Sequence, residues 1–215
     1  MPPSSSRTAL DANSQSSVPT AASPPLSTSS SGTFRFPSWH AYPPLYTIQL
    51  CARTRERQLY LWRRLALDYC AHYRIFCWER SDMLGAECEL FCNRTIHRRL
   101  NEEAMCLLWR DWVQRGDAAW ARNDRHDTLL MFWRSLRTWA DEIRAHVRRC
   151  GQAAGGIYTL QELLKAVEVD GRPVGWHGMP PLFLQRVLEG LQADGQAVLL
   201  DAHGTLGVKF SIDPR

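Results

Sequence analysis

The chain has 215 residues, of which 45% are hydrophobic and 22% charged, and its net charge is +4. This is the composition of an ordinary globular protein. No apolar run approaches the roughly 18 residues of a membrane-spanning helix, and no secretory h-region begins the chain, so we expect a cytosolic protein.

The first 33 residues are a Ser/Pro-rich stretch with few apolar side chains. Such a segment cannot bury enough apolar surface to offset the entropy of ordering it, so we predict a disordered leader over residues 1–33. Aromatic residues appear abruptly among prolines from Phe34 onward. The folded region is therefore expected to begin there.

The apolar period over residues 54–73 predicts an amphipathic helix. A strand is expected at residues 75–78 and a short second helix at residues 96–100. A third helix should begin after Asn101, a favourable N-cap followed by acidic residues, and end at Gly116. Residues 118–120 and 128–132, joined by the polar turn 122–127, predict a hairpin.

The second half follows the same plan. A helical stripe runs from Trp139 to Cys150 and ends at Gly151, and a strand stub, Ile157-Tyr158, follows. The pattern Thr159-x-x-Glu162 is typical of a capping box and predicts a short helix through Val167. We expect a third helix from Pro180 to Gly195, then a hairpin of residues 197–200 and 206–210 around the turn 201–204.

The two halves match at a fixed spacing. Gly116 and Gly195 are 79 positions apart, and the same offset aligns apolar positions before and after them. The order helix, strand, helix, helix, hairpin is that of the winged helix, a helix-turn-helix variant. We therefore predict a mainly α protein with small β-hairpins (α+β): two tandem winged-helix domains, residues 34–133 and 134–215.

Winged helices often bind DNA, so this alternative has to be considered. The third helix of each half carries one more acidic than basic residue, which offers little to phosphates. Basic clusters occur elsewhere, at residues 94–99 and 144–149. They are typical of a solvated helix face, and acidic lipid headgroups or a partner's acidic surface are the functional alternatives.

The sequence contains none of the catalytic or cofactor-binding motifs that we considered. No phosphate-cradling glycine loop, nucleophile elbow or His-Glu-x-x-His helix occurs. Cys88 and Cys92, with Cys77 and His97 nearby, lack the tight spacing of structural zinc sites and are expected to be free thiols. We expect no catalytic residues, no metal and no cofactor.

The most informative segment is Tyr42-Pro43-Pro44-Leu45-Tyr46. Two prolines favour a polyproline-like backbone, with Leu45 and Tyr46 as apolar anchors for a partner's groove. The same string could be a WW-domain ligand, or a strap that packs on its own domain. A near copy, residues 179–183, opens a strongly periodic helix, so we expect it to be structural.

The run YPPLYTIQL at residues 42–50 resembles the N-terminal segment of the ESCRT-II subunit family called vacuolar protein-sorting-associated protein 25. Further similarities follow in order, at residues 58–62, 90–100, 129–133, 151–152 with 158–163, and 207–210. The likeness covers residues 34–210. The long leader departs from the family pattern, and so does the single Pro-Pro-x-Tyr, where Phe36-Pro37-Ser38-Trp39 stands in for a first aromatic–proline repeat.

This resemblance implies a non-enzymatic adaptor that acts in endosomal sorting and multivesicular body formation. Two copies would join two larger ESCRT-II subunits, and the chain would be cytoplasmic and recruited to the endosomal membrane. The docking residues would be Pro43, Pro44, Leu45 and Tyr46, supported by Trp39 and Phe36. The second domain would recruit the initiating ESCRT-III subunit, and we place that contact at Tyr158, Thr159 and Leu160.

Overall fold

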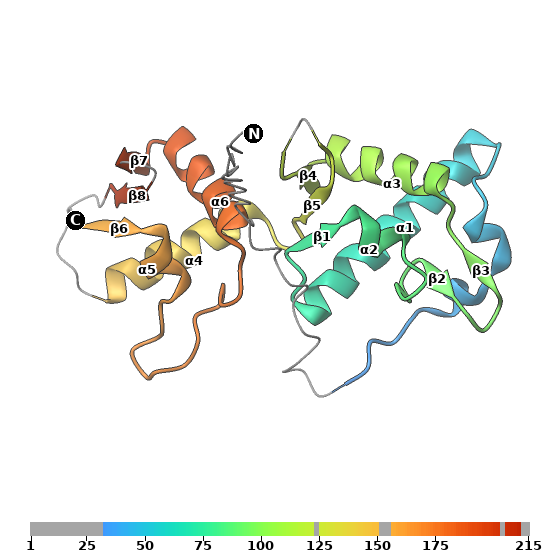
Figure 1. The fold of residues 1–215 in the computed structure, drawn as a ribbon, viewed down its shortest axis with the longest axis horizontal. Helices are drawn as coiled ribbons and strands as arrows, with labels where there is room; N and C mark the ends of the chain where they lie inside the picture. The colour runs from blue at the N-terminus through green and yellow to red at the C-terminus, as the bar shows by residue number, and fades with distance from the viewer. Residues whose placement is uncertain (1–31, 123–124, 151–155, 203–204, 212–215) are drawn as a thin grey trace, which may run out of the picture. The chain divides into compact units, whose positions relative to one another are not determined.

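A computed structural model describes residues 32–122, 125–150, 156–202 and 205–211. The first repeat contains α1 (Ala52–Tyr73), β1 (Cys77–Glu79), α2 (Arg80–Leu84), β2 (Cys92–Asn93), β3 (Arg98–Arg99), α3 (Glu102–Gln114), β4 (Ala118–Trp120) and β5 (Thr128–Met131) (Figure 1). The second contains α4 (Leu136–Arg149), β6 (Ile157–Thr159), α5 (Leu160–Leu164), α6 (Pro181–Ala193), β7 (Ala197–Ala202) and β8 (Thr205–Phe210).

The two repeats share one sheet topology. The three-stranded sheets have the orders β1-β5-β4 and β6-β8-β7, and every pairing in them is antiparallel. In each repeat, the strand after the first helix pairs with the last strand of the hairpin. This arrangement is a winged helix, so the predicted fold class is confirmed.

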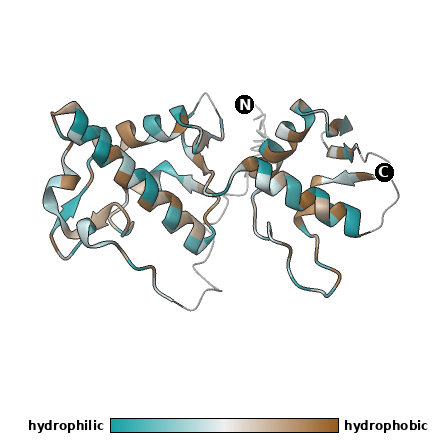
Figure 2. Ribbon diagram, turned by 180° about the vertical axis from the view of Figure 1, so that it is seen from behind, coloured by the Kyte–Doolittle hydropathy of each residue, from teal (hydrophilic) through white to brown (hydrophobic). Residues whose placement is uncertain are grey.

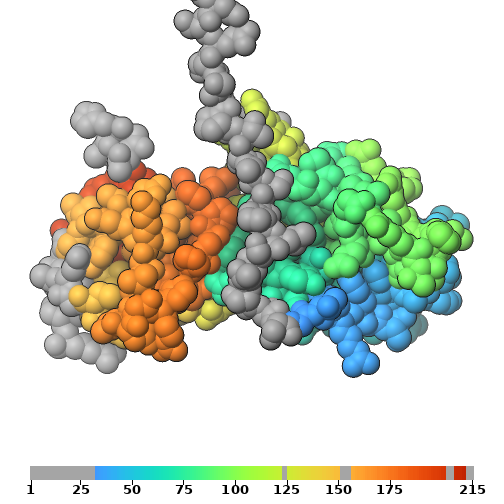
Figure 3. Space-filling view, turned by 60° about the horizontal axis from the view of Figure 1, so that its bottom comes forward, coloured from blue at the N-terminus to red at the C-terminus, as the bar shows by residue number. Residues whose placement is uncertain are grey.

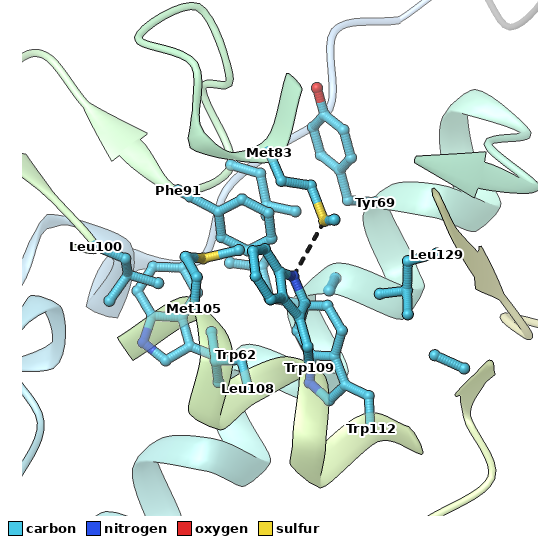
Figure 4. Close-up of a cluster of buried hydrophobic side chains, with 14 of the residues drawn as sticks. Trp62, Tyr69, Met83, Phe91, Leu100, Met105, Leu108, Trp109, Trp112 and Leu129 are labelled. Atoms are coloured by element: carbon cyan, nitrogen blue, oxygen red, sulfur yellow. Dashed lines mark hydrogen bonds between the residues drawn. The ribbon is translucent and has the colours of Figure 1, made fainter. Parts of the chain in front are cut away.

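Each repeat buries a stripe from its helices against its sheet. The helices are banded in hydrophilic and hydrophobic residues, as amphipathic helices are (Figure 2). In the first core, the indole of Trp109 on α3 donates a hydrogen bond to the sulfur of Met83 on α2, 3.2 Å away (Figure 4). The second core gathers around Trp139, Trp176 and Phe183, and it also buries Phe76 and Leu130.

The predicted helix ends are confirmed where local chemistry fixes them. The Asn101 side chain accepts a hydrogen bond from the backbone N–H of Ala104 at 2.9 Å. The Thr159–Glu162 capping box has both of its reciprocal hydrogen bonds. Gly116 and Gly195 have φ values of +77° and +69°, a conformation that glycine adopts without steric cost, one residue beyond each third helix's C-cap.

The predicted helix at residues 96–100 is wrong. The second helix is α2, and residues 92–99 form a small hairpin in which Cys92 pairs with Arg99 and Asn93 with Arg98. His97, with φ +51°, interrupts any helix there. The buried Leu100 bonds back to the carbonyl of Phe91, so its apolar spacing from Ile96 reflects the end of a hairpin.

Other boundaries differ by a few residues. Helix α5 ends at Leu164 instead of Val167, and α6 begins at Pro181 with Pro180 as its N-cap. The second hairpin extends to Ala202 and starts again at Thr205. The predicted leader lies, apart from residues 32 and 33, outside the described residues, as do the stop at Gly151 and parts of the turns 122–127 and 201–204.

Candidate partner-binding surfaces

Residues 34–50, called the strap below, lie on the surface of the first repeat, coloured blue in Figure 3. They contain two 3₁₀ turns, Ser38–Ala41 and Pro43–Tyr46. The predicted polyproline-like backbone is therefore wrong at Pro43 and Pro44. The φ of about −65° that the proline ring imposes is compatible with a 3₁₀ turn as well. Hydrogen bonds from Leu45 N–H to the carbonyl of Tyr42 and from Thr47 N–H to the carbonyl of Pro44 close this turn.

Polar groups of α1 hold the strap in this conformation. The carbonyl of Leu45 accepts hydrogen bonds from the Gln58 amide at 2.7 Å and from the Trp62 indole at 3.0 Å. Gln58 also donates to the carbonyl of Thr47 and accepts from the backbone N–H of Gln49. Gln58 is buried, so its amide is fully used by the strap.

Tyr46 is part of the first core. Only 4% of it is exposed, and its ring packs edge-on against Trp62 at 5.2 Å. Its hydroxyl donates to the carbonyl of His40 at 2.9 Å. Burial raises the pKa of Tyr46, so the phenol stays protonated. The residue expected to anchor a partner thus packs within its own domain.

His40 joins the strap to the segment before β2. Its Nε2 lies 3.0 Å from the carbonyl of Leu90, and its Nδ1 lies 3.3 Å from the amide nitrogen of Asn93. The matching tautomer donates from Nε2–H and accepts at Nδ1. Burial lowers the pKa of His40, against the opposing effects of the Leu90 hydrogen bond and the Glu89 charge.

Trp39 and Phe36 are on the inner side of the strap, toward the first core, and not on its outer face. Both are half-buried and pack against the first core. Trp39 contacts Trp62 edge-on at 5.5 Å, and Phe36 stacks on His40 at 4.3 Å. Their predicted supporting position agrees with these contacts, whereas their role toward a partner stays a prediction.

The outer face of the strap consists of Tyr42, Pro43 and Pro44. All three are exposed, and Tyr42 is 58% exposed, while Leu45 is half-buried. Sequence reasoning missed Tyr42, although an aromatic residue directly before two prolines is held extended and cannot continue a helix. Its backbone is extended here, at φ −97° and ψ 105°.

The junction expected to contact ESCRT-III faces largely inward. Tyr158 packs against Phe210 at 5.9 Å, and the side chain of Thr159 belongs to the capping box. Leu160 packs against the second core. Burial, and next the charge of Cys150, raise the pKa of Tyr158.

An apolar row lies exposed on the other face of the same sheet. Ile157, Lys209 and Val198 are opposite one another on β6, β8 and β7, and Ile157 and Val198 are 59% and 50% exposed. Leu200 is exposed two residues further along β7. A Cβ at Gly207 would lie 3.2 Å from Ile157, so the glycine leaves room for that side chain. The alternation of the strands could have revealed this row.

The third helices offer few free cations to DNA. Arg115, the C-cap of α3, pairs with Asp111 at 2.8 Å, and Arg186 on α6 pairs with Glu189 at 3.2 Å, which leaves Arg110 as the exposed arginine of α3. Within the described residues, no group of three or more potential ligands has the geometry to hold a metal ion, and no helix is long and apolar enough to cross a membrane. The Cys88 thiol is free, and burial raises its pKa to about 11.

Two winged-helix repeats with an aromatic–proline strap define a tandem winged-helix protein. The chain belongs to the ESCRT-II complex subunit family, which matches residues 39–180. It is 31% identical over 179 residues to vacuolar protein-sorting-associated protein 25 of Danio rerio, covering 83% of this chain and 99% of that protein. The corresponding protein of Arabidopsis thaliana is 32% identical over 183 residues, covering 83% and 97%.

Solved structures of this family have the same fold. The crystal structure of subunit VPS25 of the endosomal trafficking complex ESCRT-II superposes with a TM-score of 0.68 at 23% identity, covering 81% of this chain and 99% of that one. A chain of the ESCRT-II complex VPS22/VPS25/VPS36 gives 0.68 at 24% identity, covering 82% and 98%. The family resemblance expected from the sequence is confirmed.

Proposed function

We propose that this chain is a non-enzymatic adaptor of an ESCRT-II complex, acting in endosomal sorting and multivesicular body formation. Two copies would assemble with the two larger subunits. The family match over residues 39–180 carries this proposal, and a structural relative belongs to a complex named VPS22/VPS25/VPS36. The chain would be cytoplasmic and reach the endosomal membrane through its partners.

The strap is our proposed docking element for the larger subunits. Tyr42, Pro43 and Pro44 form its exposed outer face, and Leu45 borders them. Tyr46, Trp39 and Phe36 would act from below, because their packing on α1 fixes the shape that this outer face presents. A turn already held by Gln58 and Trp62 loses little conformational entropy on binding.

Truncating Tyr42 and Pro44 together to alanine tests this docking element by co-purification with the two larger subunits. An anchor at the centre of an interface costs about 2 kcal/mol or more when truncated, so the double variant should lose the complex. Pro181→Ala/Leu182→Ala is the matched control, because it alters the near copy of the motif at exposed positions of α6. No complex with the unmodified chain would refute the adaptor function. Equal losses in both variants would refute the strap as the docking element.

The second repeat, which we delimit as residues 134–215 against 34–133 for the first, is our proposed recruiter of the initiating ESCRT-III subunit. We infer that the junction Tyr158-Thr159-Leu160 supports the contact from inside, and that Ile157, Val198 and Leu200 make it. A row of exposed apolar side chains on one sheet face is typical of an interaction site.

Replacing Ile157 and Val198 by aspartate should abolish binding of the ESCRT-III subunit while leaving ESCRT-II assembly intact. The aspartate carboxylates would have to lose their hydration when an apolar partner covers this face, and that cost opposes binding. Exchanging Lys209, in the same row, for arginine provides a control that keeps the charge. Binding that persists in the double aspartate variant would show that the contact lies elsewhere.

The two rival functions predict different results. A WW groove requires the tyrosine of Pro-Pro-x-Tyr to be accessible, whereas Tyr46 is 4% exposed. Tyr46→Phe should therefore retain assembly with the larger subunits. A winged-helix DNA reader would bind duplex DNA with an affinity that falls steeply as salt rises. Arg115 and Arg186, each paired with a carboxylate, give no support to that function.

A further inference from the structure

Three side chains of the second repeat form a chain of contacts that neither docking surface uses. Cys150, the exposed C-cap residue of α4, places its sulfur 3.4 Å from Nε2 of His146, one helical turn earlier. The opposite ring nitrogen, Nδ1, lies 3.6 Å from Oε2 of Glu168. The thiol is thus exposed, while the imidazole beside it is only 6% exposed.

The imidazole has a fixed orientation. Its ring meets the buried indole of Trp176 edge-on at 5.2 Å, and that indole is itself anchored by a hydrogen bond to the carbonyl of Leu163 at 2.8 Å. With the ring held this way, the sulfur of Cys150 lies nearer to Nε2 (3.4 Å) than to Nδ1 (3.9 Å), and Glu168 lies on the Nδ1 side. The order thiol, imidazole, carboxylate is the one in which a base is oriented by a third group.

Glu168 is held in place as well. Its backbone N–H donates to the carbonyl of Arg172 at 2.8 Å, and its carbonyl accepts from Gly171, whose φ of +80° allows the tight turn. The guanidinium of Arg149 donates to both carboxylate oxygens, at 3.1 and 3.0 Å. The turn and the ion pair together fix the carboxylate beside the ring.

The remaining polar neighbour is Tyr158, across from α4 on β6. Its hydroxyl is excluded from solvent and has no hydrogen-bond partner among the described residues. Burial, and next the charge of Cys150, raise the pKa of Tyr158. Glu168, which contacts His146, and Arg149, which pairs with Glu168, are ionisable groups beside the Cys150–His146 pair.

We propose that Cys150 is a peroxide-reactive thiol, with His146 as its proton acceptor and Glu168 as the positioning residue. The S–H proton moves to Nε2, and the sulfur attacks one oxygen of hydrogen peroxide. A sulfur–oxygen bond forms as the oxygen–oxygen bond breaks, and the leaving hydroxide takes the proton from the imidazolium. The cysteine is oxidised to a sulfenic acid and the peroxide is reduced to water.

Four of the other thiols contrast with Cys150. Cys70 is fully buried, and burial raises its pKa, as it does for Cys77 and Cys88. Buried thiols of this kind are unreactive. Cys51 is exposed, and backbone and side-chain hydrogen bonds at the start of α1 lower its pKa without any histidine. It therefore provides an internal reference that does not depend on His146.

The test treats the full chain with hydrogen peroxide at neutral pH, traps sulfenic acid with dimedone and follows each cysteine by peptide mass spectrometry. Trypsin separates Cys150 in a peptide ending at Lys165 from Cys51 in a peptide ending at Arg53. An unassisted thiol is only a few per cent ionised at neutral pH, so His146→Gln should slow trapping at Cys150 roughly tenfold. Trapping at Cys51 should not change.

Because His146 is buried, its loss could also loosen the repeat, and Glu168→Gln provides a second variant at a less buried position. It should slow Cys150 several-fold with an unchanged melting temperature, and Glu168→Asp should restore part of the rate. Unchanged trapping at Cys150 in both the His146 and Glu168 variants, with the fold intact, would overturn the proposal. A parallel loss at Cys51 and Cys150 would overturn it too, because the effect would then be one on global structure.

Discussion

At the scale of one residue, Tyr46 belongs both to the proposed docking motif and to the hydrophobic core of the first repeat. Its ring lies against Trp62 and its hydroxyl bonds to His40. Tyr46→Ala should lower the free energy of unfolding by about 3 kcal/mol, as for other large buried aromatics. Tyr46→Phe should cost about 1 kcal/mol, the usual net value of one hydrogen bond.

Urea denaturation of the two variants measures both values. If Tyr46→Ala left stability unchanged while abolishing assembly, Tyr46 would be a direct contact of the partner and not a support. The sequence could not distinguish a tyrosine that contacts the partner from one that packs in the core, because the motif Pro-Pro-x-Tyr is the same for both. The choice depends on Trp62 and Gln58, which lie more than ten positions along the chain and only fold onto the strap in three dimensions.

The strap as an element should respond to acid through His40. Its folded pKa is lowered, so the folded state holds the neutral ring while the unfolded chain titrates near the usual value of about 6.5. The stability linked to His40 is thus complete above about pH 6.5 and is lost as the pH falls through the folded pKa. Unfolding midpoints measured from pH 7.5 to 5 should fall more for the unmodified chain than for His40→Gln. An equal decrease of the unfolding midpoint in both proteins would show that His40 does not cause the loss of stability in acid.

Element identity was predictable where it depends on local chemistry. The caps at Asn101 and Thr159, the stops at Gly116 and Gly195 and both wing hairpins follow from neighbours a few residues apart. Residues 96–100 show the opposite case. There, two apolar residues at helical spacing belong to a hairpin whose closure depends on the pairing of Cys92 with Arg99 and on the buried Phe91.

A similar limit applies to the second binding surface. The sequence indicated the Tyr158 junction through its likeness to the family, and the structure turns that side chain toward Phe210. The exposed row of Ile157 and Val198 depends on the register of β6 and β7 against β8. β7 and β8 are neighbours in a hairpin, but β6 is far from β8 in sequence. The register between β6 and β8 is therefore a tertiary property, which alternation restricts to one of two faces but does not fix.

For the whole molecule, we propose that each repeat binds a different partner. The strap on the first repeat would join the larger subunits, and the wing sheet of the second would present its apolar row to ESCRT-III. The family match over residues 39–180 includes the strap from Trp39 onward, the rest of the first repeat, and α4, β6 and α5 of the second. The proposed adaptor function therefore depends on assembly of this chain with the two larger ESCRT-II subunits.

Native mass spectrometry of the chain co-expressed with the two larger ESCRT-II subunits tests most directly whether the chain assembles with them through its strap. The account predicts one assembly that contains two copies of this chain and one of each larger subunit. In the Tyr42→Ala/Pro44→Ala variant that assembly should be absent, and the folded chain should appear alone. A chain that stays monomeric without any substitution, beside a complex of the larger subunits, would contradict the account.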